Sequence, residues 1–149
     1  MTSANSLFDL SGRSVLITGG GGALGGAIGL GLSQAGAEVI IVDINLKNAT
    51  NVASTIKSAG GVAHAFEGDL SKESEVEELF AKIDKITSLN ILVNAISAPH
   101  YRYSPDLMPI EDWQKTLSHD LTSFFLTSRA AAQRMIKAGK GGSIINFSS

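Results

Sequence analysis

The most informative stretch of the sequence is residues 13–25, RSVLITGGGGALG, in which a short apolar run leads into four consecutive glycines. The run Arg13–Thr18 contains Val and Ile and is bounded by glycine, which predicts a strand. After the glycines, apolar residues recur every four positions from Leu24 to Leu32, which predicts a helix over Ala23–Ala35. The stretch therefore predicts a strand, a tight glycine turn and a helix in immediate succession.

The same alternation of strand and helix continues to the end of the chain. The further strands that we expect are Glu38–Asp43, Val62–Phe66, Asn90–Val93 and Ser143–Phe147. The further helices are Asn45–Ala59, a segment that begins at Ser71, and a long one from Glu111 to about Ala138. Strict alternation predicts the α/β class: one doubly wound, Rossmann-type parallel sheet of five strands in three α/β/α layers.

One face of the long helix carries large apolar side chains at helical spacing. They are Trp113, Leu117, Leu121, Phe124 and Phe125. Because the apolar stripe of a helix usually faces the protein core, we expect this stripe to be buried against the sheet.

The composition excludes several classes of function. The chain has 149 residues, which suits one domain over 1–149, and no cysteine, which excludes disulfides, thiolate zinc sites and cysteine nucleophiles. With 12 basic and 14 acidic side chains and no basic run, we expect no binding to nucleic acid or to an anionic membrane. No aliphatic run is long enough to cross a bilayer, and the first residues lack a signal-peptide pattern, so we expect a cytoplasmic protein. The histidines have no partners at a metal-ligand spacing, and we predict no metal site.

The glycine turn matches a nucleotide-binding pattern. Gly20, Gly22 and Gly25 fit the spacing G-x-G-x-x-G, in which backbone amides at the start of a helix bind a pyrophosphate. Ligands of doubly wound sheets bind at the carboxyl ends of the strands, where this turn is expected to lie. A tight turn that binds nothing is the alternative. A phosphate-binding NTPase loop is excluded, because it needs a Lys and none occurs from Gly19 to Leu46.

Asp43 strengthens the nucleotide hypothesis. It ends the second expected strand, 23 residues after Gly20, close to the offset of ~20 residues for a carboxylate that accepts hydrogen bonds from ribose hydroxyls. A carboxylate there repels a 2′-phosphate, and no Lys or Arg lies between Arg13 and Lys47 to attract one, so we predict NAD rather than NADP as the cofactor. Two alternatives stay open: Asp43 as the cap of the following helix, and a methyltransferase that binds S-adenosylmethionine.

Four segments together resemble the short-chain dehydrogenase/reductase family. Thr18–Gly25 resembles the family's TGxxxGxG turn, with Ala23 in place of the middle glycine, and Asp69-Leu70 resembles the pair that holds adenine. Residues 90–97 resemble the family's D-x-L-V-N-N-A-G strand, although only the first Asn of NNAG is kept. Residues 142–149 are similar to the strand that delivers the active-site Ser. The four motifs occur in the family's order and cover almost the whole chain.

The resemblance implies an NAD-dependent oxidoreductase that exchanges a hydride between nicotinamide and a small-molecule secondary alcohol or ketone, for example a sugar or polyol derivative. It implies a catalytic role for Ser149, or for Ser148 if the alignment slips by one residue, which would orient the substrate oxygen. It implies another for Asp120, which stands where the family has the Asn of a proton relay; a solvated helix residue without a role is the alternative. It also implies a homo-oligomer of the full-length protein. The residues that it implies for cofactor binding are Gly19, Gly21, Gly22, Ala23, Leu24, Gly25, Asp43, Ile44, Asp69, Leu70, Asn94, Ala95 and Ile96.

The family's proton donor is not found before Ser149. A Tyr-x-x-x-Lys pair should follow the active-site Ser, and neither Tyr101 nor Tyr103 has a Lys four residues later. We therefore expect the 149 residues alone to be inactive and the full-length protein to continue into the Tyr-x-x-x-Lys segment. The alternative is a non-catalytic NAD-binding module, or pseudoenzyme, that ends at Ser149.

Overall fold

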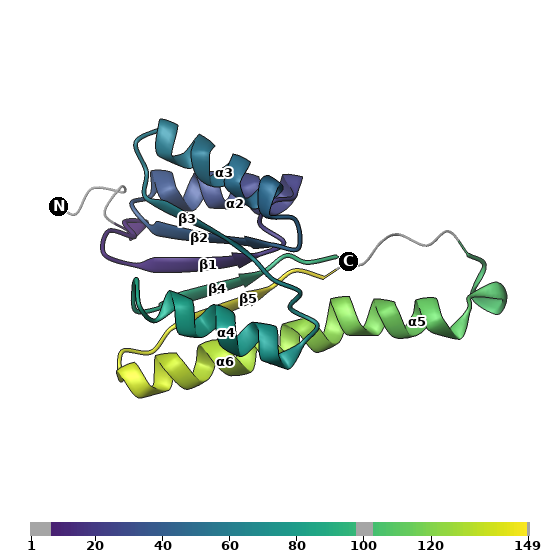
Figure 1. Cartoon of the computed structure of the whole chain (residues 1–149). Coiled ribbons are helices and arrows are strands. Elements are labelled where there is room, and N and C mark those ends of the chain that lie inside the picture. Colours follow the sequence, from purple (N-terminus) through teal and green to yellow (C-terminus); the bar gives the residue numbers. More distant parts are fainter. Residues whose placement is uncertain (1–6, 98–102, 149) are drawn as a thin grey trace.

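A five-stranded parallel sheet forms the centre of the computed structural model, which describes residues 7–97 and 103–148 (Figure 1). The strands are β1 (Ser14–Thr18), β2 (Glu38–Asp43), β3 (Ala63–Glu67), β4 (Ile91–Asn94) and β5 (Ser143–Asn146). Their spatial order is β3-β2-β1-β4-β5, so the chain reverses direction across the sheet at β1. This order confirms the predicted doubly wound, Rossmann-type sheet, whose ligand sites lie where the strand order reverses.

Helices cover both faces of the sheet. They are α2 (Ala23–Gln34), α3 (Leu46–Ser58), α4 (Glu73–Ile83), the short 3₁₀ helix η1 (Pro105–Leu107), α5 (Ile110–Leu117), the π turn η2 (Ser118–Thr122) and α6 (Ser123–Ala138). In Figure 1, α2 and α3 lie on one face, and α4 and α6 lie on the other. The result is the expected three-layer α/β/α arrangement.

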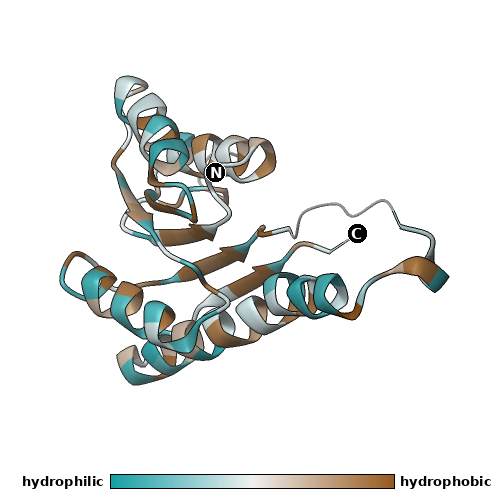
Figure 2. Ribbon diagram, turned by 45° about the vertical axis from the view of Figure 1, so that its right-hand side comes forward, coloured by the Kyte–Doolittle hydropathy of each residue, from teal (hydrophilic) through white to brown (hydrophobic). Residues whose placement is uncertain are grey.

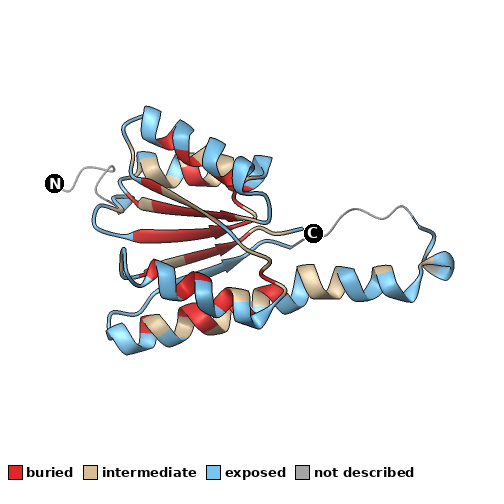
Figure 3. Cartoon of the chain, in the orientation of Figure 1, coloured by how far each residue is buried: buried red, intermediate tan, exposed pale blue. Residues whose placement is uncertain are grey.

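Each face of the sheet has its own apolar cluster. Leu16 and Ile40 belong to the cluster under α4 and α6, whereas Val15 and Ile17 belong to the cluster under α2 and α3. All five residues of β1 are buried, and its centre, residues 15–17, is apolar without alternation, since both faces of a parallel sheet are covered. Figure 2 shows the predominantly apolar strands, and Figure 3 shows that β1, β2 and β4 are mainly buried whereas β5 is exposed.

The predicted long helix is interrupted, and the prediction for its apolar stripe is wrong. In the π turn, the Ser123 amide bonds to the Ser118 carbonyl, five residues earlier. The extra residue rotates α6 relative to α5, so the two helices do not share one continuous face. Trp113, Leu121 and Phe125 of the stripe are 48%, 63% and 58% exposed. Instead, α6 buries the face that carries Leu126, Thr127, Ala130, Ala131 and Met135.

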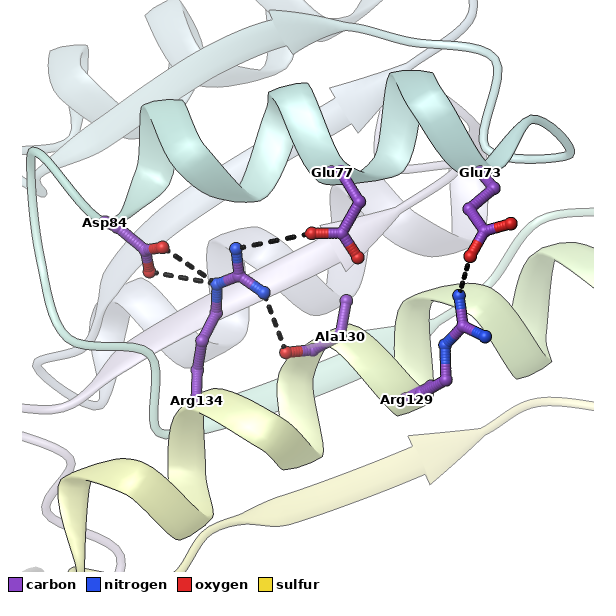
Figure 4. A network of polar contacts seen from close by, with 6 residues as sticks. All are labelled: Glu73, Glu77, Asp84, Arg129, Ala130 and Arg134. Atoms are coloured by element: carbon purple, nitrogen blue, oxygen red, sulfur yellow. Dashed lines mark hydrogen bonds and ion pairs between the residues drawn. The ribbon is translucent and has the colours of Figure 1, made fainter.

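Arg134 of α6 ties this helix to α4 (Figure 4). Its Nε donates to Asp84 Oδ2 at 2.9 Å, and its Nη1 donates to the Ala130 carbonyl at 3.1 Å. The guanidinium carbon lies 4.8 Å from the centre of the Phe80 ring, so the side chain covers an aromatic core residue. Five residues earlier, Arg129 makes an ion pair with Glu73. The two arginines therefore differ in how much of their contact is buried.

We expect Arg134→Ala to lower the free energy of unfolding by about 1–2 kcal/mol, since it removes apolar packing as well as charge-assisted hydrogen bonds. Arg129→Ala is the matched control, with an expected loss below about 0.5 kcal/mol, because its partner Glu73 is 65% exposed and exposed ion pairs contribute little. Urea unfolding of the two variants measures the difference. Equal losses would show that the buried Phe80 ring under Arg134 adds no more than the exposed Phe125 ring, which lies 5.3 Å from the guanidinium carbon of Arg129.

Candidate functional site

A cavity of about 570 Å³ lies at the carboxyl ends of the strands. The pairing of Thr18 with Val42 in β2 and with Asn94 in β4 brings three strand ends level there. Five segments border this strand-end cavity: the glycine turn with the start of α2, the ends of β2, β3 and β4, and the junction of α5 with α6. The lining residues are Gly19, 22–25, 42–44, 68–71, 95–97, His119 and Ser123.

The glycine turn brings α2 directly against the end of β1. A Cβ atom at Gly25 would lie 2.6 Å from the Gly19 carbonyl oxygen and 2.7 Å from the Gly20 Cα, closer than any side chain allows. Gly19 has a φ of +64° and backs onto the Ala95 backbone, whose oxygen would lie 2.7 Å from an added Cβ. The turn therefore depends on backbone-to-backbone contact, which only glycine permits at these positions.

The start of α2 is prepared for an anion. Gly22 is the N-cap in extended conformation, with no side-chain cap and no acidic residue in the first turn of the helix. The first amides of a helix have no partner inside it, and their positive ends attract negative charge. Residues 22–25 border the cavity, so these amides are placed to receive a phosphate group.

Asp43 joins the end of β2 to the glycine turn. Its Oδ2 accepts a hydrogen bond from the Gly21 amide at 3.1 Å, and its Oδ1 accepts one from the Asn45 amide at 3.0 Å. The cap of α3 is Asn45, whose side chain accepts from the amides of Lys47 and Asn48. The alternative that Asp43 caps this helix is therefore wrong. Gly21 does not line the cavity, and its role is to hold the Asp43 carboxylate at the cavity edge.

Asp69 and Leu70 border the cavity after β3. Burial would raise the pKa of the Asp69 carboxyl, but hydrogen bonds from the Ser71 hydroxyl, the Lys72 ammonium and the Ser71 amide outweigh it and hold the pKa below its ordinary value. Ser71 Oγ donates at 2.6 Å, and Lys72 Nζ lies 3.1 Å from the other carboxylate oxygen. At neutral pH the group is an anionic acceptor beside the apolar Leu70.

Asn94 lies behind the cavity wall and not in it. The residue is fully buried, and its Oδ1 accepts hydrogen bonds from Thr18 Oγ1 at 3.1 Å and Thr127 Oγ1 at 2.9 Å. Its Nδ2 donates to Asn146 Oδ1 at 2.9 Å and Ser128 Oγ at 3.3 Å. The side chain thus joins β1, β4, β5 and α6. Because both polar atoms of this side chain have protein partners, the side chain supports the cavity wall and has no polar atom left for a cofactor.

The remaining predicted residues divide into three groups. Ala95 and Ile96 line the cavity, as do Ala23, Leu24 and Ile44. Asp120 is exposed in the π turn and does not line the cavity, and Ser149 lies outside the described residues.

Sequence reasoning missed two cavity residues on the α5–α6 junction, His119 and Ser123. No motif marks them, because the π turn that aims them at the cavity has no sequence signal. Among the described residues, no three His, Asp or Glu side chains are grouped to hold a metal ion. In the same part of the chain, no helix has the length and apolar character needed to span a membrane.

The sequence matches known proteins over almost its whole length. The family model described as short chain dehydrogenase matches residues 13–149. The chain is 39% identical over 144 residues to a short chain dehydrogenase/reductase of Gibberella zeae, covering 94% of this chain and 52% of the relative. It is 32% identical over an alignment of 159 residues, gaps included, to a D-threitol dehydrogenase of Mycolicibacterium smegmatis, covering all of this chain and 59% of the relative.

A solved structure has the same fold. It is a 7α-hydroxysteroid dehydrogenase complexed with NADH and 7-oxo glycochenodeoxycholic acid, with a TM-score of 0.90 and 33% identity. The match covers all of this chain and 57% of the solved one. The chain therefore spans about half the length of the curated relatives that it matches.

Two glycines of α2 provide a matched test of the close contact. At Gly31 an added Cβ meets nothing within 4 Å, so Gly31→Ala is expected to stabilise the protein by about 0.5–1 kcal/mol through helix propensity. Gly25→Ala is expected to destabilise it by more than about 1 kcal/mol, because backbone atoms of the turn must move. Thermal or urea unfolding gives both values. Stabilisation by Gly25→Ala would disprove the backbone contact.

Proposed function

Because this chain belongs to the short chain dehydrogenase family, we propose that the protein containing it is an NAD-dependent oxidoreductase that interconverts a secondary alcohol and a ketone. The observation that carries the proposal is one cavity that combines the uncapped start of α2 with the Asp43 carboxylate. A bound nicotinamide would supply or accept the hydride. The family match gives no support to the methyltransferase alternative.

The residues around the cavity fit a dinucleotide. The amides of residues 23–25 would bind the pyrophosphate beside Gly22, whose own amide donates to the Gly19 carbonyl, and Asp43 would accept hydrogen bonds from the adenosine ribose. Asp69 and Leu70 would hold the adenine, one as an acceptor and the other as an apolar surface. Ala95 and Ile96 would border the nucleotide from the β4 side. These assignments keep the cofactor residues predicted from the sequence, with Gly21 and Asn94 in supporting positions.

Asp43 also supports NAD in preference to NADP. Its carboxylate would lie beside the 2′-hydroxyl of the ribose and would repel a phosphate there. Among the described residues that line the cavity, there is no Lys or Arg to compensate that charge.

The proposed reaction needs residues at the other end of the dinucleotide. We assign Ser149 to orient the substrate oxygen, and Asp120 to a proton relay in which a carboxylate replaces the family's amide. A carboxylate cannot donate a hydrogen bond when ionised, so the relay would depend on its protonation state. For the substrate we propose a sugar or polyol derivative, in line with the D-threitol dehydrogenase among the relatives.

The exposed apolar side chains of α5 and α6 support a homo-oligomer. Trp113, Leu121 and Phe125 are each about half exposed or more. Large apolar patches are uncommon on the free surface of a monomer and usually mark a contact with another molecule. Packing of these side chains against a second copy of the protein would remove them from water.

The direct test of the function uses protein expressed from the complete reading frame. We expect the formation of reduced cofactor from a panel of secondary alcohols with NAD, followed by its absorbance, and faster turnover with polyols than with steroids. A protein that binds NADH but reduces no ketone and oxidises no alcohol would favour the non-catalytic alternative.

Cofactor preference tests Asp43. Asp43→Asn removes the negative charge and keeps one acceptor oxygen, which can serve the Gly21 amide at the expense of the Asn45 amide, so the affinity for NADPH relative to NADH is expected to rise by about tenfold or more. Glu38→Gln, at the opposite end of β2, is the control and should leave the ratio unchanged. Fluorescence titration with NADH and with NADPH measures the ratio of the two affinities. A ratio that stays constant in Asp43→Asn would refute the assignment to the ribose.

A further inference from the structure

His119 is a cavity residue to which neither the sequence motifs nor the proposed function gives a role. Its Nδ1 lies 2.8 Å from the Lys115 carbonyl oxygen, one turn earlier in the helix. A carbonyl oxygen only accepts hydrogen bonds, so Nδ1 must carry the proton. In the neutral ring, Nε2 is then an acceptor. The residue is partly buried and lines the cavity.

The backbone of His119 is fixed by its neighbours. The Ser123 hydroxyl donates to the His119 carbonyl, and the Ser123 amide bonds back to Ser118 across the π turn. Ser123 itself is buried. One turn further on, the Thr127 hydroxyl donates to Asn94 Oδ1, and this hydrogen bond joins α6 to the sheet. The imidazole therefore stands on a helix segment that is held to the cavity wall.

The cavity matches the adenosine half of the proposed dinucleotide site. The glycine turn after β1 marks the pyrophosphate, and Asp43 and Asp69 place the adenosine towards β2 and β3. Within the described part of the chain, no residue of β5 borders the cavity. His119 thus shares one cavity with Asp69 and Leu70, the residues assigned to adenine.

Resting on the proposed function, we propose that His119 is a specificity-determining residue for the adenine base, whose exocyclic amino group donates a hydrogen bond to Nε2. That amino group has two hydrogens, which suits two acceptors, the Asp69 carboxylate and the His119 ring. A base with a carbonyl oxygen at the same position, such as hypoxanthine, would place that acceptor oxygen against the acceptor Nε2, and no hydrogen bond could form between them. The site would therefore select adenine dinucleotides against their deaminated analogues.

The test compares direct binding of NADH and of its hypoxanthine analogue to the full-length protein by calorimetry. His119→Asn keeps an amide donor near the position of Nδ1 for the Lys115 carbonyl but has no atom at Nε2. His119→Gln places an amide oxygen near the position of Nε2. We expect His119→Asn to weaken NADH binding by about three- to tenfold with a smaller effect on the analogue, and His119→Gln to retain most of the preference.

The outcomes separate this inference from the proposed function. If the wild-type protein binds NADH but His119→Asn binds it equally well, or loses affinity for both dinucleotides equally, the role of His119 is overturned and the function stands. If the wild-type protein binds no NADH, the role of His119 and the proposed function are both overturned. Nitrogen NMR of the imidazole in the ligand-free protein gives a second readout, in which a proton on Nε2 would contradict the proposal. Thermal unfolding of both variants controls for loss of folding.

Discussion

The close backbone contact between the glycine turn and α2 is the constraint on which the rest of the site depends. Without a Cβ at Gly25, the helix begins directly against the carbonyl of Gly19, and Gly19 in turn lies against the backbone of Ala95. The turn is thus packed between the start of α2 and the end of β4. This contact fixes the direction of the first helical amides, and with it the place where a negative group can be bound.

A second buried interaction holds the other side of the cavity. The Asn94 side chain makes hydrogen bonds to Thr18, Thr127, Ser128 and Asn146, which satisfy its oxygen and its amide group. Such fully satisfied polar groups define one arrangement of the core, because a shift of any partner would leave a buried group unpaired. Through Thr127 the network reaches α6, and the π turn at the start of that helix carries His119 to the cavity.

The strands, the glycine turn and the strand-end residues were predictable because each has a local cause. An unbroken apolar run specifies a strand covered on both faces, and the glycines at 19 and 25 specify contacts that a side chain would prevent. The stripe on the long helix was mispredicted because helical periodicity marks an apolar face but does not show whether the sheet reaches it. α5 extends past the ends of the strands and buries none of its residues, and α6 buries a different face, so Trp113 and Phe125 remain on the surface (Figure 1).

The sequence by itself determined the class of fold, the family and the strand-end segments that surround the cavity, because apolar period and glycine spacing act over a few residues. The tertiary structure decided which atoms of those segments face the cavity. Asn94 points into the core because partners from β1, β5 and α6 meet it there, and Gly21 lies behind Asp43 because its amide is the donor to that carboxylate. His119 lines the cavity only because α6, a helix from late in the chain, packs against α4 and β4, a contact between distant segments that no local pattern records.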